Sequence, residues 1–380
     1  MKFEFSGPGR IVFGLRSGLE SLPEIASWSR RILVVTGSDV SRAGWLLDGL
    51  DALGATMAIH SQPGEPTVDD CREGVRIARA FGAGAVVALG GGSVVDLGKA
   101  IAAVAPHTED PFDHLEVVGK GLPLPGPGLP CAAIPTTAGT GAEATRNAVL
   151  AADDVKVSLR GPSLLPRLAV VDPYLSVGLG AAQTGWCGLD ALTQLIEPLT
   201  SRFANPMSDG FCREGIPRAS RSLSVALRDG DDLDARSDLA LASLLSGLAL
   251  ANSRLGLVHG LAAPVGGLLG APHGAVCARL LPIAWRTNVR ALSRDSHPGL
   301  ERYRDAAKLL TGNVDASIDD GLAKIEELTA LAKAPGFAHW GMLEQDIPDL
   351  CERAAKASSM KGNPVDLTLP ELAEVLRQAL

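Results

Sequence analysis

Five short runs rich in β-branched and small apolar residues, separated by helical stretches, constrain the fold of this chain more than any other feature. This alternation is typical of strand–helix–strand units, which pack their strands into a parallel sheet. The runs cover residues 31–36, 56–60, 85–89, 131–134 and 168–172. After Pro173 they stop, and Ala- and Leu-rich segments such as 237–251 and 317–332 follow. The sequence therefore predicts an α/β first half and an all-helical second half.

The length of the chain favours two domains. A chain of 380 residues is longer than the roughly 250–300 residues at which a single core stops growing. The change of pattern near residues 173–180 places the boundary. We therefore expect an α/β domain over residues 1–176 and a helical domain over residues 177–380. Thr368 and Glu371 have the spacing of a capping box, which predicts a last packed helix that runs to Leu380.

Charge and cysteine usage exclude several classes of protein. The net charge of −8, without any cluster of Lys and Arg, disfavours nucleic acid and anionic membrane surfaces as partners. The six cysteines are scattered and form no CxxC pair, which is typical of reduced thiols in a cytosol. The N-terminus lacks the apolar run of an export signal. Leu255–Pro272 contains several glycines and prolines, so we expect a buried helix plus a loop there instead of a membrane span. The sequence predicts a cytoplasmic protein.

A glycine-rich turn marks a possible phosphate-binding site. Gly90, Gly91, Gly92 and Ser93 follow an apolar strand run and open the helical stretch 94–104. Glycines at such a turn let backbone N–H groups approach a pyrophosphate, and Ser93 is placed to cap the helix. A plain tight turn between a strand and a helix is the alternative.

A second polar cluster follows the next strand run. Thr136, Thr137 and Thr140 stand with two glycines in the segment 135–143. Turn bonding or helix capping is the ordinary use of such threonines. Loops that follow successive parallel strands meet at one edge of a sheet, where ligands bind. The two clusters together favour a nucleotide site.

The second half holds residue types suited to a divalent metal. Asp190 and Gln194 are four apart in a helical run and so project from one face. His259 and His273 flank a Gly-rich apolar stretch. A carboxylate with imidazoles suits a catalytic Fe(II) or Zn(II). A hydrogen-bonded core histidine and a helix cap are the alternatives for the two histidines, and the amide of Gln194 is a poor ligand, so spacing alone does not identify the site.

Six motifs in order resemble those of the iron-containing (group III) alcohol dehydrogenase family. They run from near Phe5 to the end of the chain: GPGRIVFG, ALGGGSVVDLGKAIA, IPTTAGTGAEATRNAVL, LAVVDP, GLDALTQLIEP and LGLVHGLAAPVGGLLGAPHGAVCARLLP. The resemblance implies a fold like that of dehydroquinate synthase, with a dinucleotide-binding α/β domain, a helical domain and a metal in the cleft between them. It also implies a homodimer.

The resemblance assigns roles to individual residues. It places the metal ligands at Asp190, His259 and His273, with Gln194 as a direct or water-mediated fourth group. The positions that it implies for NAD(P)(H) are Gly37, Ser38, Gly90, Gly91, Gly92, Ser93, Asp96, Thr136, Thr137, Thr140, Asn147 and Lys156. Gly37 and Ser38 end the first strand run, where a carboxylate would select NAD(H), so we expect NADP(H) to be accepted. Asp39 lies two residues further on and leaves selection of NAD(H) open.

Two positions depart from the family pattern. The family usually has His where this chain has Gln194, and a further His near the substrate where this chain has Ala263. The expected reaction is hydride transfer between the nicotinamide and a carbonyl carbon of a small alcohol or aldehyde, with the metal polarising the carbonyl oxygen. With Ala263 in place, the proton would come from solvent or a cofactor hydroxyl.

Three other functions stay open on the sequence alone. A maleylacetate reductase shares the overall pattern, but that branch tends to have Asn at the position of Asp190 and a different threonine motif. A lyase of the dehydroquinate synthase kind would use NAD without net redox change. A catalytically silent nucleotide-binding protein would lose nothing measurable when Asp190 is replaced by alanine.

Overall fold

The computed structural model describes residues 2–116, 118–152, 155–294 and 296–380. Clustering of contacts divides the chain into two compact units. The sheet unit comprises Ser6–Thr137 and Gly141–Ser176, and the helical unit comprises Val177–Leu380 with Ala138–Thr140 and the first residues up to Phe5. Thr140 therefore belongs, by its contacts, to the helical unit.

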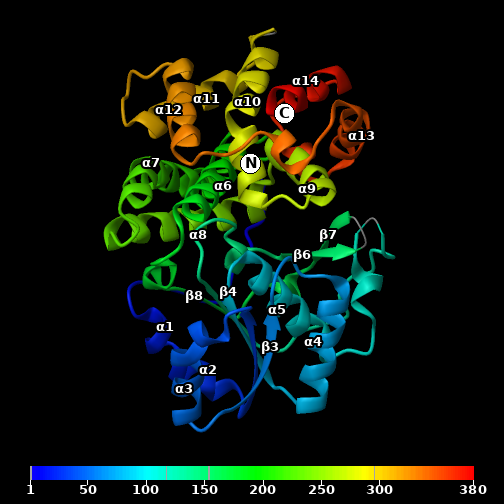
Figure 1. The fold of residues 1–380 in the computed structure, drawn as a ribbon. Coiled ribbons are helices and arrows are strands. Elements are labelled where there is room, and N and C mark those ends of the chain that lie inside the picture. The colour runs from blue at the N-terminus through cyan, green and yellow to red at the C-terminus, as the bar shows by residue number, and fades with distance from the viewer. Residues whose placement is uncertain (1, 117, 153–154, 295) are drawn as a thin grey trace. The chain divides into compact units, whose positions relative to one another are not determined.

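The sheet unit is built on six parallel strands in the order β1-β8-β5-β4-β2-β3 (Figure 1). This arrangement confirms the predicted parallel sheet. Its strands are β1 (Ile11–Phe13), β2 (Arg31–Gly37), β3 (Thr56–Gln62), β4 (Ala85–Gly90), β5 (Cys131–Pro135) and β8 (Leu168–Val171). The sequence did not predict the short edge strand β1 or the separate antiparallel hairpin of β6 (Asn147–Ala152) and β7 (Val155–Arg160).

Helices cover both faces of the sheet, and its inner strands β2, β4, β5 and β8 are therefore buried on both sides. Along β2, Leu33 and Val35 pack toward α4 (Val68–Phe81) and α5 (Gly92–Val104). Ile32 and Val34 point the other way, toward α2 (Leu22–Trp28) and α3 (Gly44–Ala52). This is the alternation that a pleated strand imposes. α1 (Ser17–Glu20) precedes α2.

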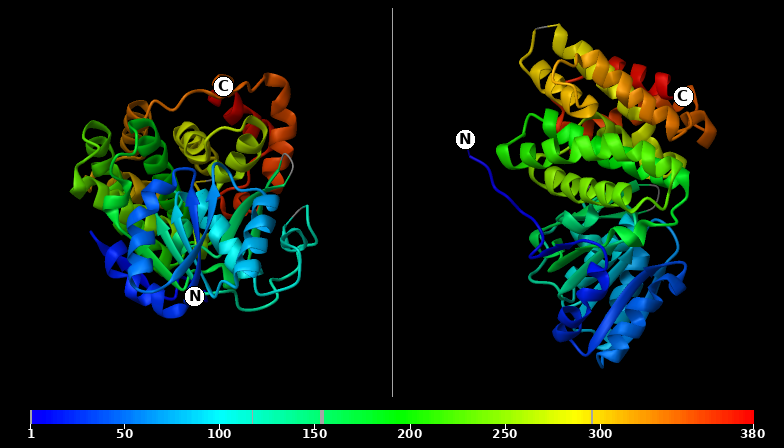
Figure 2. Two further views of the ribbon diagram at one scale, coloured as in Figure 1. Left: turned by 60° about the horizontal axis from the view of Figure 1, so that its bottom comes forward. Right: turned by 90° about the vertical axis from the view of Figure 1, so that its left-hand side faces the viewer.

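The helical unit confirms the predicted change of architecture, because every regular element described after Ser176 is a helix. Its longer helices are α6 (Ala181–Thr200), α7 (Pro206–Arg228), α8 (Leu233–Ser253), α9 (Leu257–Leu269), α10 (His273–Ser293), α11 (Gly299–Thr311), α12 (Ile318–Leu331), α13 (Ile347–Lys356) and α14 (Leu369–Ala379). The predicted capping box at Thr368 and Glu371 begins α14. Figure 2 shows α6, α7 and α8 (green) packed side by side.

Helix α6 lies at the centre of the helical unit. Every residue from Gly188 to Thr200 is buried. Leu189, Leu192 and Leu199 pack into one apolar core with α7, α8, α10, α11 and α12. A second core joins α9 and α10 to α13 and α14. The polar side chains of α6 therefore lie where they need partners within the protein.

The apolar stretch 255–272 forms α9 and its flanking loops, as expected. Within the described residues, no helix on its own has the length and apolar character needed to cross a bilayer. Helices α8 and α9 meet that test only when taken together, and they are bent by 102° at their junction.

Candidate metal centre

Helix α6 places a buried carboxylate at the middle of the candidate site. Asp190 is 1% exposed, so its charge requires compensation from neighbouring groups. Oδ1 of Asp190 lies 3.3 Å from Nε2 of His259 and 3.7 Å from Nε2 of His273. The structure thus brings together three of the four residues proposed from the sequence as metal ligands.

His259 is held in position by a second acidic residue of α6. Oε2 of Glu197 lies 2.8 Å from Nδ1 of His259, and Oε1 of Glu197 accepts the backbone N–H of Val258 at 2.6 Å. The same carboxylate therefore satisfies a free N–H in the first turn of α9 and directs the imidazole. Nε2 of His259 faces Asp190 as a result.

His273 reaches the site because α10 approaches α6 closely at its first turn. A Cβ atom at Gly274 would lie 2.7 Å from the carbonyl oxygen of Trp186 in α6. Glycine permits this approach, and His273 precedes it on α10. The His273 side chain is 33% exposed and does not cap α10.

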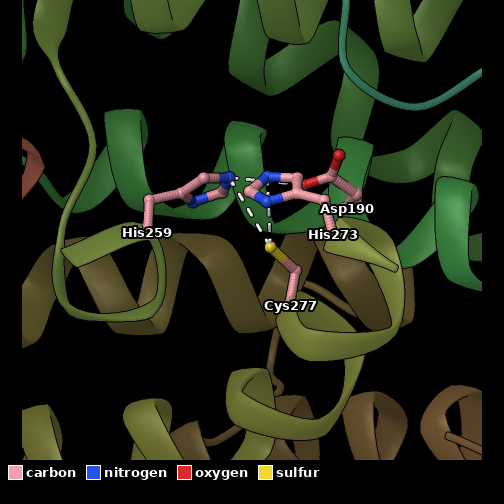
Figure 3. Close-up of side chains that lie close together, drawn as sticks. All are labelled: Asp190, His259, His273 and Cys277. Carbon is pink, nitrogen blue, oxygen red and sulfur yellow. Dashed lines mark hydrogen bonds and ion pairs between the residues drawn. The ribbon is translucent and has the colours of Figure 1, made fainter. Parts of the chain in front are cut away.

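A fourth side chain, Cys277, completes the cluster shown in Figure 3. Its Sγ atom lies 3.6 Å from Nε2 of His273 and 3.8 Å from Nε2 of His259. Asp190, His259, His273 and Cys277 each offer one ligand atom, and these four atoms lie within 4.8 Å of one another. The sequence analysis missed Cys277, although its spacing of four from His273 on one helix was a usable signal.

The charges of the cluster shift its ionisation. Burial by itself raises the pKa of Asp190, but the positive charges of His273 and His259 and the hydrogen bonds from His259 and Gln194 lower it to about 2. Burial by itself lowers the pKa of His273, but the negative charges of Cys277 and Asp190 raise it to about 9. The pKa of His259 is raised in the same way.

Gln194 lies next to this cluster but differs from it in chemistry. Its side chain is buried and hydrogen-bonds to Asp190 one turn earlier on α6. Within the described part of the chain, its Oε1 atom has no hydrogen-bond partner. A buried acceptor without a partner is unfavourable unless an ion or a water supplies the missing contact. This position agrees with a direct or water-mediated contact of Gln194 with an ion, and the hydrogen bond to Asp190 agrees equally with a Gln194 that only hydrogen-bonds within the site.

The donor set fits a divalent transition metal. One carboxylate oxygen, two imidazole nitrogens and a sulfur are ligand types that bind Zn(II) and related ions. The hydrogen bond that Nδ1 of His259 donates to the carboxylate of Glu197 is the supporting contact usual behind a metal-bound imidazole. The buried, partnerless oxygen of Gln194 is a further sign that the protein alone does not satisfy this site.

The glycine-rich turn of the sheet unit lies at the carboxyl end of β4, as expected. Helix α5 begins at Gly92, and Gly91 is its N-cap. The expectation that Ser93 caps the helix was wrong, because the helix begins before it and Ser93 lies in the first turn. A Cβ atom at Gly90 would lie within 2.9 Å of all three side-chain carbons of Val94, so glycine is required there to close the turn.

The first two threonines of the segment 135–143 contact the glycine-rich turn. The backbone N–H of Thr136 donates to the carbonyl oxygen of Gly90 at 2.9 Å. The side chain of Thr137 lies beside Gly91, 3.6 Å from the position of an added Cβ atom. Two of the three threonines therefore adjoin the glycine turn, where β4 and β5 end side by side.

A buried ammonium connects α5 to the segment after the threonines. Nζ of Lys99 lies 2.9 Å from Oδ1 of Asp96 and donates to the carbonyl oxygen of Ala142 and to Thr145. The other oxygen of Asp96 accepts the N–H of Val149 in β6 at 3.0 Å. Asp96 thus supports the loop and hairpin, and Lys99 is a positioning residue that the sequence analysis missed.

The remaining cofactor candidates lie at different places in the sheet unit. Asn147 and Lys156 lie on the hairpin of β6 and β7. Asn147 pairs with Arg160, and Lys156 pairs with Ala151, four residue pairs further along the hairpin. Nζ of Lys156 lies 3.3 Å from a carboxylate oxygen of Glu65. Gly37 ends β2 and is followed by Ser38, and a Cβ atom at Gly37 would meet no atom within 4 Å.

Comparison with known proteins identifies the family. The family model described as iron-containing alcohol dehydrogenase matches residues 8–173, and the model of the C-terminal part of the Fe-containing alcohol dehydrogenase family matches residues 184–380. The chain belongs to the iron-containing alcohol dehydrogenase family. It is an oxidoreductase that acts on CH–OH groups, and membership in this family implies NAD(H) and an iron-type metal ion.

Several members of the iron-containing alcohol dehydrogenase family are similar along most of the chain. The 1,3-propanediol dehydrogenase of Klebsiella pneumoniae is 35% identical over 322 residues, which are 83% of this chain and 80% of that protein. The lactaldehyde reductase of Escherichia coli (strain K12) is 31% identical over 362 residues, 92% of each chain. A crystal structure of 1,3-propanediol oxidoreductase is 31% identical, covers 100% of both chains and superposes with a TM-score of 0.91.

These relationships confirm the resemblance that the six sequence motifs indicated. Within an iron-containing alcohol dehydrogenase, Glu197 is a positioning residue that sequence reasoning missed. It follows Asp190 by seven residues, a spacing that returns an α-helix to within about 20° of the same face. That periodicity was the signal available for it.

Proposed function

We propose that this alcohol dehydrogenase uses Asp190, His259 and His273 to hold one divalent ion, Fe(II) or Zn(II), that is needed for turnover. The observation that carries the proposal is the approach of both imidazole Nε2 atoms to Oδ1 of one buried carboxylate, at 3.3 and 3.7 Å. When bound, such an ion supplies Lewis-acid polarisation of a carbonyl oxygen. Glu197 fixes the orientation of His259, and Gln194 contributes through its free oxygen directly or through water.

The sheet unit is proposed to bind NAD(P)(H). Gly90 to Ser93, Thr136 and Thr137 form the expected site at the strand ends, because backbone N–H groups at the start of α5 are free to receive a pyrophosphate. Gly37 and Ser38 are proposed to face the adenosine ribose. Asp96, Thr140, Asn147 and Lys156 complete the proposed set, Asp96 by supporting the hairpin on which Asn147 and Lys156 lie.

The substrate is proposed to be a small alcohol or aldehyde. No side chain is proposed as proton donor, because Ala263 occupies the position where the family usually has a further histidine near the substrate. Solvent or a cofactor hydroxyl would supply the proton. The two units are proposed to act as a cofactor-binding domain (1–176) and a metal-binding and substrate domain (177–380).

A cytoplasmic location and a homodimeric assembly are also proposed. All six cysteines are free thiols, which suits a reducing cytoplasm. A homodimer is proposed by family resemblance, and size-exclusion chromatography with light scattering tests it directly.

Replacement of the central carboxylate tests the proposed function. Asp190→Ala should remove both the bound metal, measured by elemental analysis, and the oxidation of a panel of alcohols with NAD(H) and NADP(H). Asp234→Ala removes an exposed carboxylate of α8 and should preserve both. Full activity in the metal-free wild-type enzyme would contradict the proposal. Cofactor-dependent turnover without net absorbance change at the nicotinamide would point instead to a lyase.

A further inference from the structure

We propose that Cys277 is the fourth protein ligand of the ion, so that this site favours Zn(II) over Fe(II). The inference rests on the proposed metal site at Asp190, His259 and His273 and adds to it a ligand of a different chemical class. Gln194, at the family's fourth ligand position, offers only a neutral amide.

Four of the six distances among the ligand atoms are close to the edges of a metal-centred tetrahedron. With metal–nitrogen and metal–oxygen distances near 2.0–2.1 Å and a metal–sulfur distance near 2.3 Å, tetrahedral edges are about 3.3 Å between light atoms and about 3.6 Å to sulfur. The Nε2 atom of His259 lies 3.3 Å from Oδ1 of Asp190, and that of His273 lies 3.7 Å from it. The Sγ atom of Cys277 lies 3.6 and 3.8 Å from the two imidazole nitrogens. All four atoms lie within 4.8 Å of one another, so they are close enough to share one ion.

The backbone fixes the sulfur at this place. Cys277 follows His273 by one turn of α10, so the two side chains project from the same face. The cysteine is 0% exposed and packs in the apolar core that joins α9 and α10. The sulfur faces the two imidazoles from one side while Asp190 on α6 approaches from another (Figure 3).

The identity of the donor decides the preference between metals. Thiolate sulfur is a soft ligand that selects zinc, and zinc also binds mixed nitrogen, oxygen and sulfur sites more strongly than Fe(II) does. Asp190, His259, His273 and Cys277 would hold the ion with four protein ligands, and catalytic zinc sites can expand to five ligands when substrate binds. The site should therefore retain Zn(II) strongly.

Spectroscopy of the cobalt-substituted enzyme tests the sulfur ligand without reference to activity. The full-length protein is stripped with a chelator and loaded with Co(II), whose thiolate complexes show a charge-transfer band in the near ultraviolet. The wild type should show this band and Cys277→Ser should lose it. Cys187→Ser, a change three residues before Asp190, and Cys351→Ser, a change at a thiol buried in α13, should both keep it.

One further measurement needs no variant, and a second compares the two metals. X-ray absorption of the Zn(II)-loaded wild type should show one sulfur neighbour at about 2.3 Å. Competitive chelator titration should show at least a tenfold loss of Zn(II) affinity in Cys277→Ser and a smaller loss of Fe(II) affinity.

The outcomes separate this inference from the proposed function. If Co(II) binding requires Asp190 but the wild type shows neither the band nor a sulfur neighbour, Cys277 is not a ligand and the proposed function stands. If the wild type binds no Co(II) or Zn(II), or if Asp190→Ala binds them equally well, the metal site itself is refuted. A band that persists in Cys277→Ser overturns the inference.

Discussion

The carboxylate of Glu197 lies 2.8 Å from Nδ1 of His259, and this contact directs the opposite ring nitrogen toward Asp190. Loss of such a supporting partner typically weakens metal affinity 10- to 100-fold, by roughly 1.4 to 2.7 kcal/mol. Glu197→Gln should reduce Zn(II) affinity by about that amount in a chelator competition. Glu352→Gln, a change at an exposed carboxylate of α13, serves as its control. An unchanged affinity in Glu197→Gln would show that the imidazole needs no support.

Gln194→His should raise metal affinity. The side chain lies one turn from Asp190 on the same helix, and imidazole is a stronger donor to Fe(II) and Zn(II) than a neutral amide oxygen. We expect a gain of about tenfold, or about 1.4 kcal/mol, in chelator titrations. Gln183→His introduces the same residue at an exposed position of α6 and should have no effect. Equal metal affinities of the wild type and Gln194→His would exclude Gln194 from the energetics of the site.

Two glycine substitutions in the helical unit should change stability in opposite directions. Gly274→Ala would place a Cβ atom 2.7 Å from the carbonyl oxygen of Trp186, so α10 must move away from α6. We expect a loss of about 1–3 kcal/mol and weaker metal binding. Gly210→Ala meets no atom within 4 Å on an exposed part of α7 and should gain about 0.5–1 kcal/mol. Thermal unfolding and metal titration measure both, and a neutral Gly274→Ala would disprove the close approach.

The stability of the protein should depend on the ionisation of Glu143. Burial raises the pKa of this carboxyl to about 7, against an opposing effect of Lys99. Because the folded state holds the proton more tightly than the unfolded chain, stability should fall as pH rises from about 4.5 to about 7 and level off above that, by at most about 3 kcal/mol.

The variant Glu143→Gln isolates this contribution, because it retains the shape of the protonated side chain without its titration. Its melting temperature relative to the wild type should rise between pH 5 and pH 8. A constant difference across this range would mean that Glu143 has an ordinary pKa in the folded protein.

Cofactor preference should respond to the end of β2. The side chain of Asp39 accepts hydrogen bonds from Ser41. Gly37 has open space around it. We therefore expect no carboxylate to repel a 2′-phosphate bound at Gly37. We expect the wild type to accept NADP(H) and Gly37→Asp to lower kcat/KM for NADP(H) at least tenfold relative to NAD(H). Gly37→Ala adds volume without charge and should leave the ratio nearly unchanged. A strong preference of the wild type for NAD(H) would place the ribose contact elsewhere.

The sequence predicted the layers of this fold because they depend on local patterns. Five of the six strands of the main sheet are β-branched or apolar runs of at least four residues, whereas β1 has three. The Ala-rich strand β6 has little intrinsic strand preference and relies on contacts such as that of Asp96 with Val149. Tertiary contacts of this kind are not visible in a single sequence.

The candidate site was predictable only as separate pieces. Residue types and family motifs identified Asp190, His259 and His273, but their meeting depends on the packing of three helices that are distant in the chain. Glu197 lies seven residues after Asp190 and Cys277 lies four residues after His273, and both spacings place side chains on one helix face. The sequence analysis still missed both residues, because many buried side chains share such spacings. The Gly274 contact, which sets the distance between α10 and α6, has no sequence signal beyond the glycine itself.

Asp190 and Glu197 share one uninterrupted, fully buried stretch of α6, and this arrangement restricts how the gene can vary. Each residue inserted into or deleted from an α-helix turns everything beyond it by about 100°. A single insertion between the two carboxylates would rotate Glu197 away from His259 even if every side chain of the site were preserved. A substitution at Gln194 does not change the rotation of Glu197 relative to Asp190 about the helix axis. The number of residues between the two carboxylates must therefore be kept for Asp190 and Glu197 both to reach His259.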